Sequence, residues 1–422
     1  MNMKILIIGA GPGGYETAAE ALRRGIEVTL VNDGPLGGTC LNEGCIPTKT
    51  FCASPSLQEA ILRKDEVLPQ LRKGIEFLLK KAENVQGRAK FLDSHTVEVN
   101  GKEYTADKII IAAGSGSASL PVPGAELALS SREMLELKEV PKRLCIVGGG
   151  VIGLEFASIF RRFGSEVTVL EYCPGILPRF DTDIAKRLKA SLARTGIAIE
   201  TSAQLTSITR DGALKLNYIK KDQQCSVEAD VALMAVGRKP ALEGLGLDEA
   251  GIEYGKRGIK VDENMCTNVP GIYAVGDVTG GLMLAHYASA QGLKALNHIC
   301  GIKDDIRLDI CPAAVFTEPE LATVGLSEED CAGRGISYRV HKSQYRANGK
   351  ALASGESEGY CKIISEEGSG RILGAHILGA HASDLIHEVA ALMNFNASVA
   401  QAAAVIHAHP SLSEVLQAAY RS

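Results

Sequence analysis

The chain contains the same strand–turn–helix–strand pattern twice, and this repeat restricts the possible folds more than any other feature. In the first copy, an apolar strand at residues 4–8 runs into the glycine-rich turn GAGPGG at 9–14. An Ala-rich helix is expected over 15–24 and a second strand over 27–31. This order is that of a β-turn-α-β unit.

The second copy repeats this order further along the chain. An apolar strand at 144–147 leads into the turn GGGVIG at 148–153, then a helix that ends near Phe163 and a strand at 167–171. Both turns have the spacing G-x-G-x-x-G between a strand and a helix, which is typical of dinucleotide binding. Two such units predict two bound dinucleotides.

The three glycines of each turn have separate tasks. The first permits a tight turn, the second lets the backbone approach a pyrophosphate, and the third lets the helix pack closely on the strand. The N–H groups and the positive dipole end of the helix then hold the phosphates. The glycines with these tasks are Gly9, Gly11 and Gly14 in the first unit and Gly148, Gly150 and Gly153 in the second.

The end of the second strand of each unit indicates which nucleotide binds there, because an acidic residue at this point accepts the ribose hydroxyls. In the second unit this residue is Glu171, and no Arg stands at 172 or 173. A carboxylate there repels a 2′-phosphate, which favours NAD over NADP. In the first unit the equivalent position is Asn32, with Asp33 next, and the sequence leaves open which of the two contacts ribose.

Two cysteines of the run at 37–49, Cys40 and Cys45, can form a disulfide that opens and closes as a two-electron store. Residues five apart on a regular helix lie about 8 Å apart, beyond the roughly 7 Å limit for a disulfide. The segment is therefore expected to be distorted, which Gly44 permits. This cysteine pair lies on the same chain segment as the first glycine turn, and a flavin exchanges two electrons with a dithiol. We therefore assign FAD to the first unit and NAD to the second.

At 422 residues the chain is too long for one ordinary core, and about three domains are expected. Apolar strands that end in glycine follow the two units at 109–114, 231–237 and 272–277. The predicted fold class is α/β, with two Rossmann-like domains and an α+β C-terminal dimerisation domain. We expect the FAD-binding domain at 1–120 and 241–308, the NAD-binding domain at 121–240 and the C-terminal domain at 309–422.

The C-terminal part differs in pattern from the two units. Strands are expected near 314–325, 337–344 and 359–379, and helices near 383–394, 398–404 and 411–420.

Composition excludes several classes of function. The net charge is −5 without a basic cluster, which excludes a nucleic-acid partner. No apolar run reaches the roughly 18 residues that span a bilayer. The chain begins directly with a strand, which favours a cytoplasmic protein. The eleven cysteines include no C-x-x-C pair or spaced Cys/His cluster, so no metal site is expected.

With these motifs, nearly the whole chain resembles the class I flavoprotein disulfide reductases. The residues that carry the resemblance lie at 9–15, 37–49, 148–158, 236–240, 269–277, 283–286, 316–320 and 407–414.

The resemblance implies roles for single residues. Cys45 faces the flavin, and Cys40 exchanges with the substrate. Lys49 and Glu155 form an ion pair beside the flavin N5 atom, where nicotinamide docks. Further contacts with FAD are implied for Gly38, Thr39, Ala89, Gly114, Asp277 and Ala285, and a further contact with NAD for Gly237.

The resemblance also implies that His409 is the catalytic base and Glu414 the carboxylate that orients it. Thiol–disulfide exchange needs a thiolate, and a histidine that titrates near neutral pH can take the proton. Pro410 is expected to begin a helix that places Glu414 one turn on, and His407 to be structural. In this family the His–Glu pair comes from the partner subunit, which implies a homodimer.

Within the family, the motifs are most similar to those of the enzymes that oxidise dihydrolipoamide with NAD⁺. The implied partners are the lipoyl domains of 2-oxo acid dehydrogenase or glycine cleavage complexes. A glutathione-type reductase would use NADPH, which Glu171 disfavours. A mercuric reductase would end in a Cys pair, which 418–422 lacks, and a transhydrogenase or NADH oxidase of this fold lacks one loop cysteine.

Two alternatives stay open. One is a related enzyme that acts on another disulfide. The other is a non-catalytic flavin-binding redox scaffold, which the unusually short stretch between Lys49 and Ile109 suggests. The complete set of six expected catalytic residues argues against the scaffold.

Overall fold

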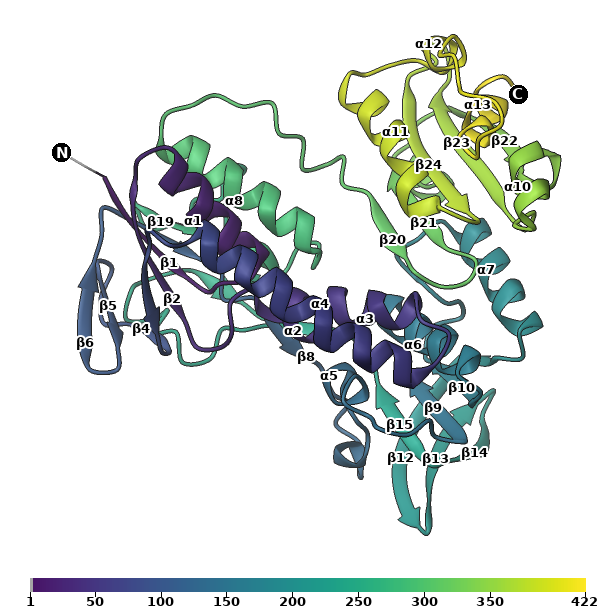
Figure 1. Ribbon diagram of the computed structural model, residues 1–422, viewed down its shortest axis with the longest axis horizontal. Helices are drawn as coiled ribbons and strands as arrows, with labels where there is room; N and C mark the ends of the chain where they lie inside the picture. The colour runs from purple at the N-terminus through teal and green to yellow at the C-terminus, as the bar shows by residue number, and fades with distance from the viewer. Residues whose placement is uncertain (1–2) are drawn as a thin grey trace. The chain divides into compact units, whose positions relative to one another are not determined.

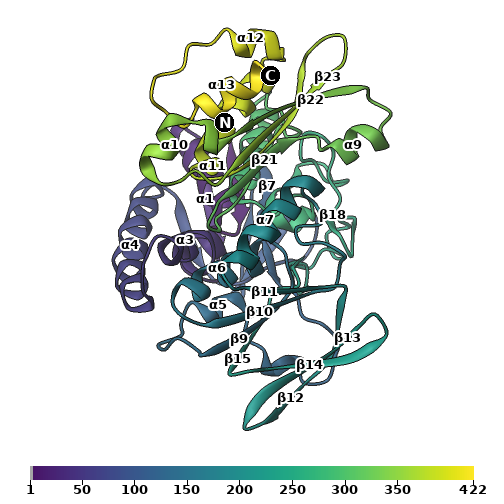
Figure 2. The same cartoon turned by 90° about the vertical axis from the view of Figure 1, so that its right-hand side faces the viewer.

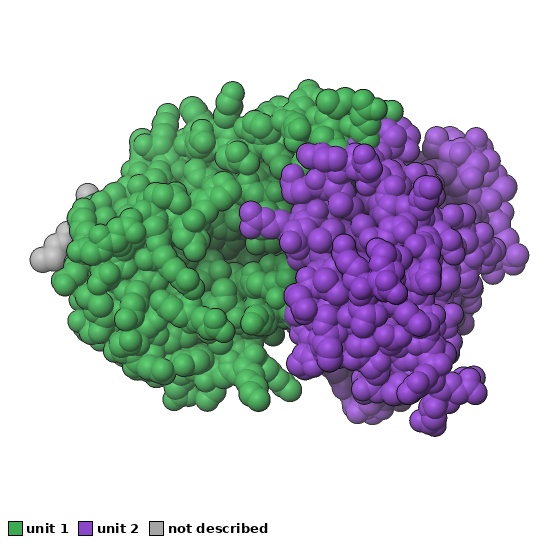
Figure 3. Space-filling model, turned by 90° about the horizontal axis from the view of Figure 1, so that it is seen from below, with its two compact units in different colours: residues 1–53, 58–118, 237–308 green, residues 54–57, 119–236, 309–422 purple. Residues whose placement is uncertain are grey.

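The computed structural model describes residues 3–422 of the chain. It divides into two compact units, which Figure 3 shows in different colours. Unit 1 is made of residues 1–53, 58–118 and 237–308, and unit 2 of residues 54–57, 119–236 and 309–422. Each unit is described by itself.

Unit 1 is built on a parallel sheet with the strand order β19-β7-β1-β2-β3. The strands are β19 (Ile272–Ala274), β7 (Lys108–Ile111), β1 (Lys4–Ile8), β2 (Glu27–Asn32) and β3 (Glu83–Gln86). The central strands β1 and β7 are almost fully buried, as expected of a parallel sheet covered on both faces. Helices α1 (Pro12–Arg23) and α8 (Ala285–Ile299) lie side by side on this sheet (Figure 1).

Smaller elements complete unit 1. An antiparallel sheet is formed by β4 (Ala89–Phe91), β5 (Thr96–Val99) and β6 (Lys102–Thr105). Strand β8 (Ser115–Ser117) pairs with β16 (Arg238–Pro240), and β17 (Tyr254–Gly255) pairs with β18 (Gly258–Ile259). The remaining helices are α2 (Gly38–Glu43), α3 (Cys45–Cys52), the long α4 (Leu57–Leu78) and the 3₁₀ turn η2 (Gly276–Thr279).

The first part of unit 2 contains a second parallel sheet, with the order β11-β10-β9-β15. These strands are β11 (Ala198–Thr201), β10 (Glu166–Glu171), β9 (Arg143–Val147) and β15 (Val231–Met234), and helices α6 (Val151–Arg162) and α7 (Thr182–Arg194) connect them. An antiparallel sheet of β12 (Ala203–Asp211), β13 (Ala213–Lys220) and β14 (Gln223–Ala229) follows. The short elements η1 (Ala125–Leu127) and α5 (Ser131–Met134) precede β9.

The C-terminal part of unit 2 is an antiparallel sheet with the order β20-β21-β24-β23-β22. The strands are β20 (Ala313–Val315), β21 (Leu321–Gly325), β22 (Tyr338–Gln344), β23 (Tyr360–Glu366) and β24 (Ile372–Leu378). Helices α11 (Ala382–Asn394), α12 (Val399–Ala403) and α13 (Glu414–Tyr420) share one hydrophobic core with this sheet (Figure 2). Helix α9 (Glu328–Gly333) packs in a separate small cluster, and α10 (Gly349–Ser354) follows β22.

This architecture confirms the predicted fold class, but two helix boundaries were predicted wrongly. Helix α1 begins at Pro12, because Gly11 is its N-cap and proline is well suited to the first helical position. The last helix begins at Glu414 and not at Pro410, because residues 410–413 form a turn. Over residues 3–422, no helix is long and apolar enough to cross a membrane.

Candidate active site

The first glycine turn has the geometry of a phosphate-binding loop. Gly14 packs so tightly that a Cβ atom there would collide with the Gly9 carbonyl oxygen. Helix α1 has Gly11 as its N-cap, with no side-chain cap and no acidic residue in its first turn. The N–H groups at its start are therefore available to an anion, and this end of the sheet fits a dinucleotide pyrophosphate.

Asn32 lies at the end of β2 and faces this turn. Its Oδ1 atom accepts a hydrogen bond from the Ala10 N–H at 3.2 Å, and its Nδ2 atom donates to the Gly34 carbonyl. Asp33, in contrast, is exposed. Of the two residues that the sequence left open, Asn32 is the one whose side chain is held against the glycine turn.

The second glycine turn repeats this geometry in unit 2. A Cβ atom at Gly153 would collide with the Gly148 carbonyl oxygen, and Gly150 caps α6 without a side-chain hydrogen bond. Glu171 is only 7% exposed, and its carboxylate accepts from the backbone N–H of Gly149 at 2.5 Å and of Cys173 at 2.6 Å. The carboxylate is thus fixed beside the turn, where a ribose would lie and a 2′-phosphate would be repelled.

The two cysteines lie on either side of a helix break, as the spacing predicted. Cys40 belongs to α2, whereas Cys45 is the first residue of α3. The break occurs at Gly44, whose φ of −139° and ψ of −107° are not helical. A Cβ atom at Gly44 would come within 3.0 Å of the Thr39 carbonyl oxygen, so the close approach of the two helices also favours glycine.

The environment of Cys40 disfavours the thiolate form of its sulfur when the pair is reduced. The pKa of the Cys40 thiol is raised, first by a hydrogen bond with the Cys45 side chain, then by burial and by the charge of Cys45. The positive charge of Lys49 acts in the opposite direction. Because the thiolate is the reactive form, exchange at this site needs a base.

Asp277 lies in the η2 turn that follows β19 and is held by two residues that the sequence reasoning missed. The Ser115 hydroxyl donates to Asp277 Oδ2, and Arg238 donates to Ser115 Oγ and to the Ser115 carbonyl, both at 2.7 Å. The Arg238 Nε atom lies 3.9 Å from Asp277 Oδ2. The sequence feature that could have pointed to these two residues is their position: Ser115 directly follows Gly114, and Arg238 directly follows Gly237.

The other residues predicted to contact cofactors lie in loops or at the ends of helices and strands, or have only main-chain atoms available for contact. The Ala89 side chain is buried in the core of unit 1, so only its backbone is available. Ala285 is the first residue of α8, and Gly276 before Asp277 donates its N–H to Gln291 Oε1 at 2.7 Å. Among these predicted contacts, the residues with positive φ are Gly38 at the start of α2, Gly114 after β7 and Gly237 before β16. Thr39 is exposed.

Glu155 is buried on α6, and its position is set by the C-terminal part of unit 2. Its Oε1 atom accepts a hydrogen bond from the Phe316 N–H at 3.0 Å. Sequence reasoning missed this contact, although Phe316 lies in a motif that carried the resemblance. Lys49 lies in α3 of unit 1 and Glu155 in unit 2, so their ion pair stays a prediction.

His409 and Glu414 lie together, although the helix begins later than predicted. His409 Nδ1 lies 3.0 Å from Glu414 Oε1, and Glu414 Oε2 accepts from the Ser411 N–H at 2.9 Å. The pKa of Glu414 is lowered, first by the Ser411 hydrogen bond and then by His409. The turn at 410–413 brings the carboxylate back to the ring, and His409 itself is 78% exposed.

His407 has a different environment from His409. Its side chain is only 4% exposed, and its Nε2 atom pairs with Glu388 Oε1 at 3.0 Å. This placement agrees with the expected structural role.

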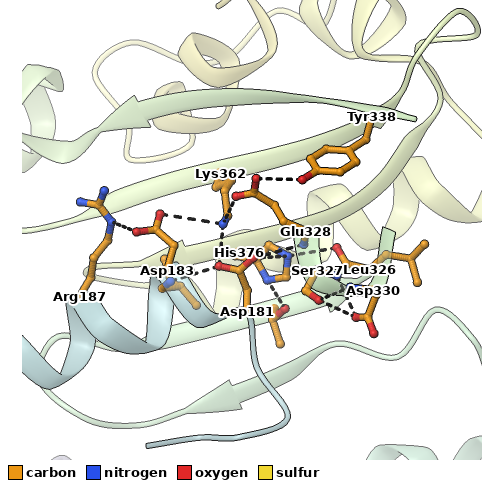
Figure 4. A network of polar contacts seen from close by, with 12 residues as sticks. Asp181, Asp183, Arg187, Leu326, Ser327, Glu328, Asp330, Tyr338, Lys362 and His376 are labelled. Carbon is orange, nitrogen blue, oxygen red and sulfur yellow. Dashed lines mark hydrogen bonds and ion pairs between the residues drawn. The ribbon is translucent and has the colours of Figure 1, made fainter. Parts of the chain in front are cut away.

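A buried polar network that the sequence analysis did not find lies elsewhere in unit 2 (Figure 4). Lys362 is fully buried, and its Nζ atom bonds to Asp181 Oδ1 at 2.6 Å and to Glu328 Oε1 at 2.8 Å. Lys362 on β23 lies directly opposite His376 on β24. Burial lowers the pKa of His376, so Lys362 supplies the positive charge of the network at neutral pH. The only feature of the sequence that pointed to this network was one lysine and one histidine inside two strands that are largely apolar.

Replacing Lys362 with methionine is expected to lower the free energy of unfolding by about 3–5 kcal/mol, because Asp181 and Glu328 would lose their counter-charge. Denaturant unfolding followed by circular dichroism measures this loss. Arg339→Met is the control, since Arg339 on β22 is exposed and its 3.8 Å pair with Glu367 should contribute less than about 1 kcal/mol. Equal losses in the two variants would contradict the buried role of Lys362.

Comparisons with known proteins agree with this geometry. The family described as "Pyridine nucleotide-disulphide oxidoreductase" matches residues 3–292, and the dimerisation domain of the same family matches residues 311–420. Dihydrolipoyl dehydrogenase of Bacillus subtilis is 38% identical, covering 100% of this chain and 98% of the relative. Dihydrolipoyl dehydrogenase of Chlamydia muridarum is 40% identical, covering 97% and 94%.

Solved structures give the same result. The HOCl-induced flavoprotein disulfide reductase RclA of Escherichia coli superposes with a TM-score of 0.92 at 32% identity, over 99% of both chains. LpdA of Mycobacterium tuberculosis superposes with a TM-score of 0.92 at 31% identity, also over 99% of both.

These matches confirm the cofactors that the two glycine turns predicted, FAD and NAD, and the C-terminal dimerisation domain supports a homodimer. When bound, FAD relays electron pairs between a dithiol and a nicotinamide. The chain belongs to the pyridine nucleotide-disulphide oxidoreductases, and it is an FAD-dependent disulfide oxidoreductase.

Proposed function

We propose that this protein oxidises dihydrolipoamide to lipoamide with NAD⁺ as the electron acceptor. The helix break at Gly44 carries this proposal, because it brings Cys40 and Cys45 into contact in the unit that holds the first glycine turn. The fixed carboxylate of Glu171 supports NAD as the second nucleotide. Relatives along the whole chain that are named dihydrolipoyl dehydrogenase support the substrate.

The residues divide the thiol chemistry between them. His409 takes a proton from the substrate thiol at Nε2, since Nδ1 is held by Glu414. The substrate thiolate attacks the Cys40 sulfur, forming a mixed disulfide as the Cys40–Cys45 bond breaks and Cys45 leaves as a thiolate. His409 then gives its proton to the departing Cys40 sulfur and takes that of the second substrate thiol, whose sulfur displaces Cys40 and completes the lipoamide ring. Cys40 and Cys45 now hold the electron pair.

The other proposed site residues support the thiol chemistry or hold the two nucleotides. Glu414 fixes the tautomer of His409 and supports its positive charge. We propose that, in a homodimer, the His–Glu pair of one subunit serves the thiol pair of the other. Lys49 stabilises the Cys45 thiolate, and Glu155 pairs with Lys49 where nicotinamide docks. The groups proposed to hold FAD are Gly9, Gly11, Gly14, Asn32, Gly38, Thr39, Ala89, Gly114, Asp277 and Ala285. Those proposed to hold NAD are Gly148, Gly150, Gly153, Glu171 and Gly237.

The proposed partners are lipoyl domains, which carry the dithiol on a long flexible lysine. The deciding experiment is a steady-state assay of dihydrolipoamide with NAD⁺ beside an assay of glutathione disulfide with NADPH. We expect turnover of the first pair only. Turnover of the second pair without the first would overturn the proposal.

A second candidate function is the reduction of another disulfide. It is favoured by the similarity to the HOCl-induced disulfide reductase of Escherichia coli over 99% of both chains. In that case, the enzyme with NADH would reduce a different disulfide faster than it reduces lipoamide.

A further inference from the structure

Helix α4 carries an arginine on the face that packs toward the segment with the two thiols. Leu68 and Ile75 of α4 are buried in the same core cluster as Leu41 of α2. Arg72 lies four residues after Leu68 and three before Ile75, so it shares their face of the helix. This helix is the main element of the unusually short stretch at 50–108, to which the sequence gave no task.

The guanidinium group of Arg72 contacts an amide and no carboxylate. Its Nη2 atom donates to Asn42 Oδ1 at 2.8 Å. None of the ion pairs found within residues 3–422 includes Arg72, and its Nε atom is buried without an acceptor there. A buried N–H group without an acceptor costs free energy. The side chain is therefore held toward α2 by Asn42 and not by a counter-charge.

Asn42 passes this contact on to the turn that precedes α2. Its Nδ2 atom donates to the Leu36 carbonyl at 3.0 Å and to the Gly38 carbonyl at 2.8 Å. The orientation of the amide is fixed, because a guanidinium group only donates hydrogen bonds and a carbonyl only accepts them. A positive charge on the amide oxygen also polarises the group and strengthens the bonds that its N–H groups donate.

The turn needs such support because it consists of two glycines. Gly37 and Gly38 have positive φ values of 95° and 58°, and glycine adds little stiffness of its own. The Gly37 N–H donates to the Ala10 carbonyl at 2.9 Å, and a Cβ atom at Gly38 would come within 2.6 Å of Gly11 Cα. Gly38 is also the first residue of α2, and Cys40 is the third. A displaced turn would therefore displace Cys40.

We propose that Arg72 is a positioning residue for the thiol pair. Through Asn42 it holds the turn at 36–38 against the first glycine turn, and thereby holds Cys40 where exchange can occur. Rates depend steeply on such placement, since a displacement of about 1 Å can cost a hundredfold. The inference rests on the proposed exchange at Cys40, but not on which dithiol or disulfide is the substrate.

The test measures how fast dithiothreitol reduces the Cys40–Cys45 disulfide in the oxidised holoenzyme. One dithiothreitol thiolate attacks the Cys40 sulfur and Cys45 leaves as a thiolate; the second thiol then displaces Cys40 and closes a cyclic disulfide. Samples are quenched with acid and alkylated, and free Cys40 is followed by peptide mapping. We expect Arg72→Met to slow the reduction about ten- to a hundredfold, the usual effect of losing a hydrogen bond from a charged group. Arg72→Lys keeps a charged donor and should recover most of the rate.

Arg63→Met is the matched control, because Arg63 is exposed on the same helix. It should keep the native rate. Electron transfer from NADH to ferricyanide, with FAD in excess, bypasses the thiols and should be unchanged in Arg72→Met. An equal loss of this reaction would place the defect in folding or cofactor binding and overturn the positioning role.

A double-mutant cycle tests whether Arg72 acts through Asn42. Asn42→Ala should slow the reduction by itself, and Arg72→Met should add little in that background, because the bond between the two residues is already absent. A rate that falls by the product of the two single effects would overturn the inference. A native rate in Arg72→Met would overturn it alone, whereas a native protein without a reducible Cys40–Cys45 disulfide would overturn the proposed function as well.

Discussion

Replacing either Cys40 or Cys45 with serine is expected to lower dihydrolipoamide turnover by roughly a thousandfold or more, because a serine hydroxyl cannot enter a disulfide. The two variants should nevertheless differ. Cys40→Ser keeps Cys45, the thiol assigned to the flavin side, so the reduced protein should retain a long-wavelength flavin absorbance band. Cys45→Ser should lose the band together with the activity.

Steady-state assays and absorbance spectra after reduction with NADH measure the two effects. Cys52→Ser is the control, because Cys52 ends the same helix α3 and has no part in the proposed exchange. It should keep the native rate. The opposite pattern, with the band lost in Cys40→Ser and kept in Cys45→Ser, would show that the two roles are interchanged.

His409→Gln is expected to lower kcat/KM for dihydrolipoamide by about a hundredfold to ten-thousandfold, the usual contribution of a general base. The reason is that the substrate thiols are mostly protonated at neutral pH, which leaves no thiolate to attack the Cys40 sulfur without a base. Glu414→Gln should have a smaller effect, since it keeps the imidazole but weakens the 3.0 Å contact that orients it.

Electron transfer from NADH to ferricyanide bypasses the thiol exchange and should be unaffected in both variants. His387→Gln, at an exposed position on α11, is the control for replacing a histidine in the same part of the chain. If His409→Gln lost the ferricyanide reaction equally, its defect would lie in folding or cofactor binding and the role as base would be wrong.

Much of the fold follows from local patterns in the sequence. Continuous apolar runs such as 4–8 and 144–147 are typical of parallel strands that are buried on both faces, and each became the central part of such a sheet. The glycine spacing at 9–14 and 148–153 depends on backbone contacts within a few residues. For the same reason the distortion at Gly44 could be predicted from the distance that a regular helix would impose on Cys40 and Cys45.

The sequence was less informative about those parts of the candidate site in which contacts join residues far apart in the chain. The sequence could name Glu155 and Asp277, but not that Phe316 holds one or that Ser115 and Arg238 hold the other. The pairing of His409 with Glu414 was expected from a helix that begins at Pro410, yet a turn provides it.

The sequence by itself therefore determined the two nucleotide-binding units, the thiol pair and the succession of strand, turn, helix and strand within each unit, because these depend on interactions between near neighbours. Only the tertiary structure decided the partners of the buried charges. Lys362 meets Asp181 and Glu328 because chain folding brings three separate segments together around its buried ammonium group. There, an ammonium group is stable only beside carboxylates, and no local pattern specifies which carboxylates those are.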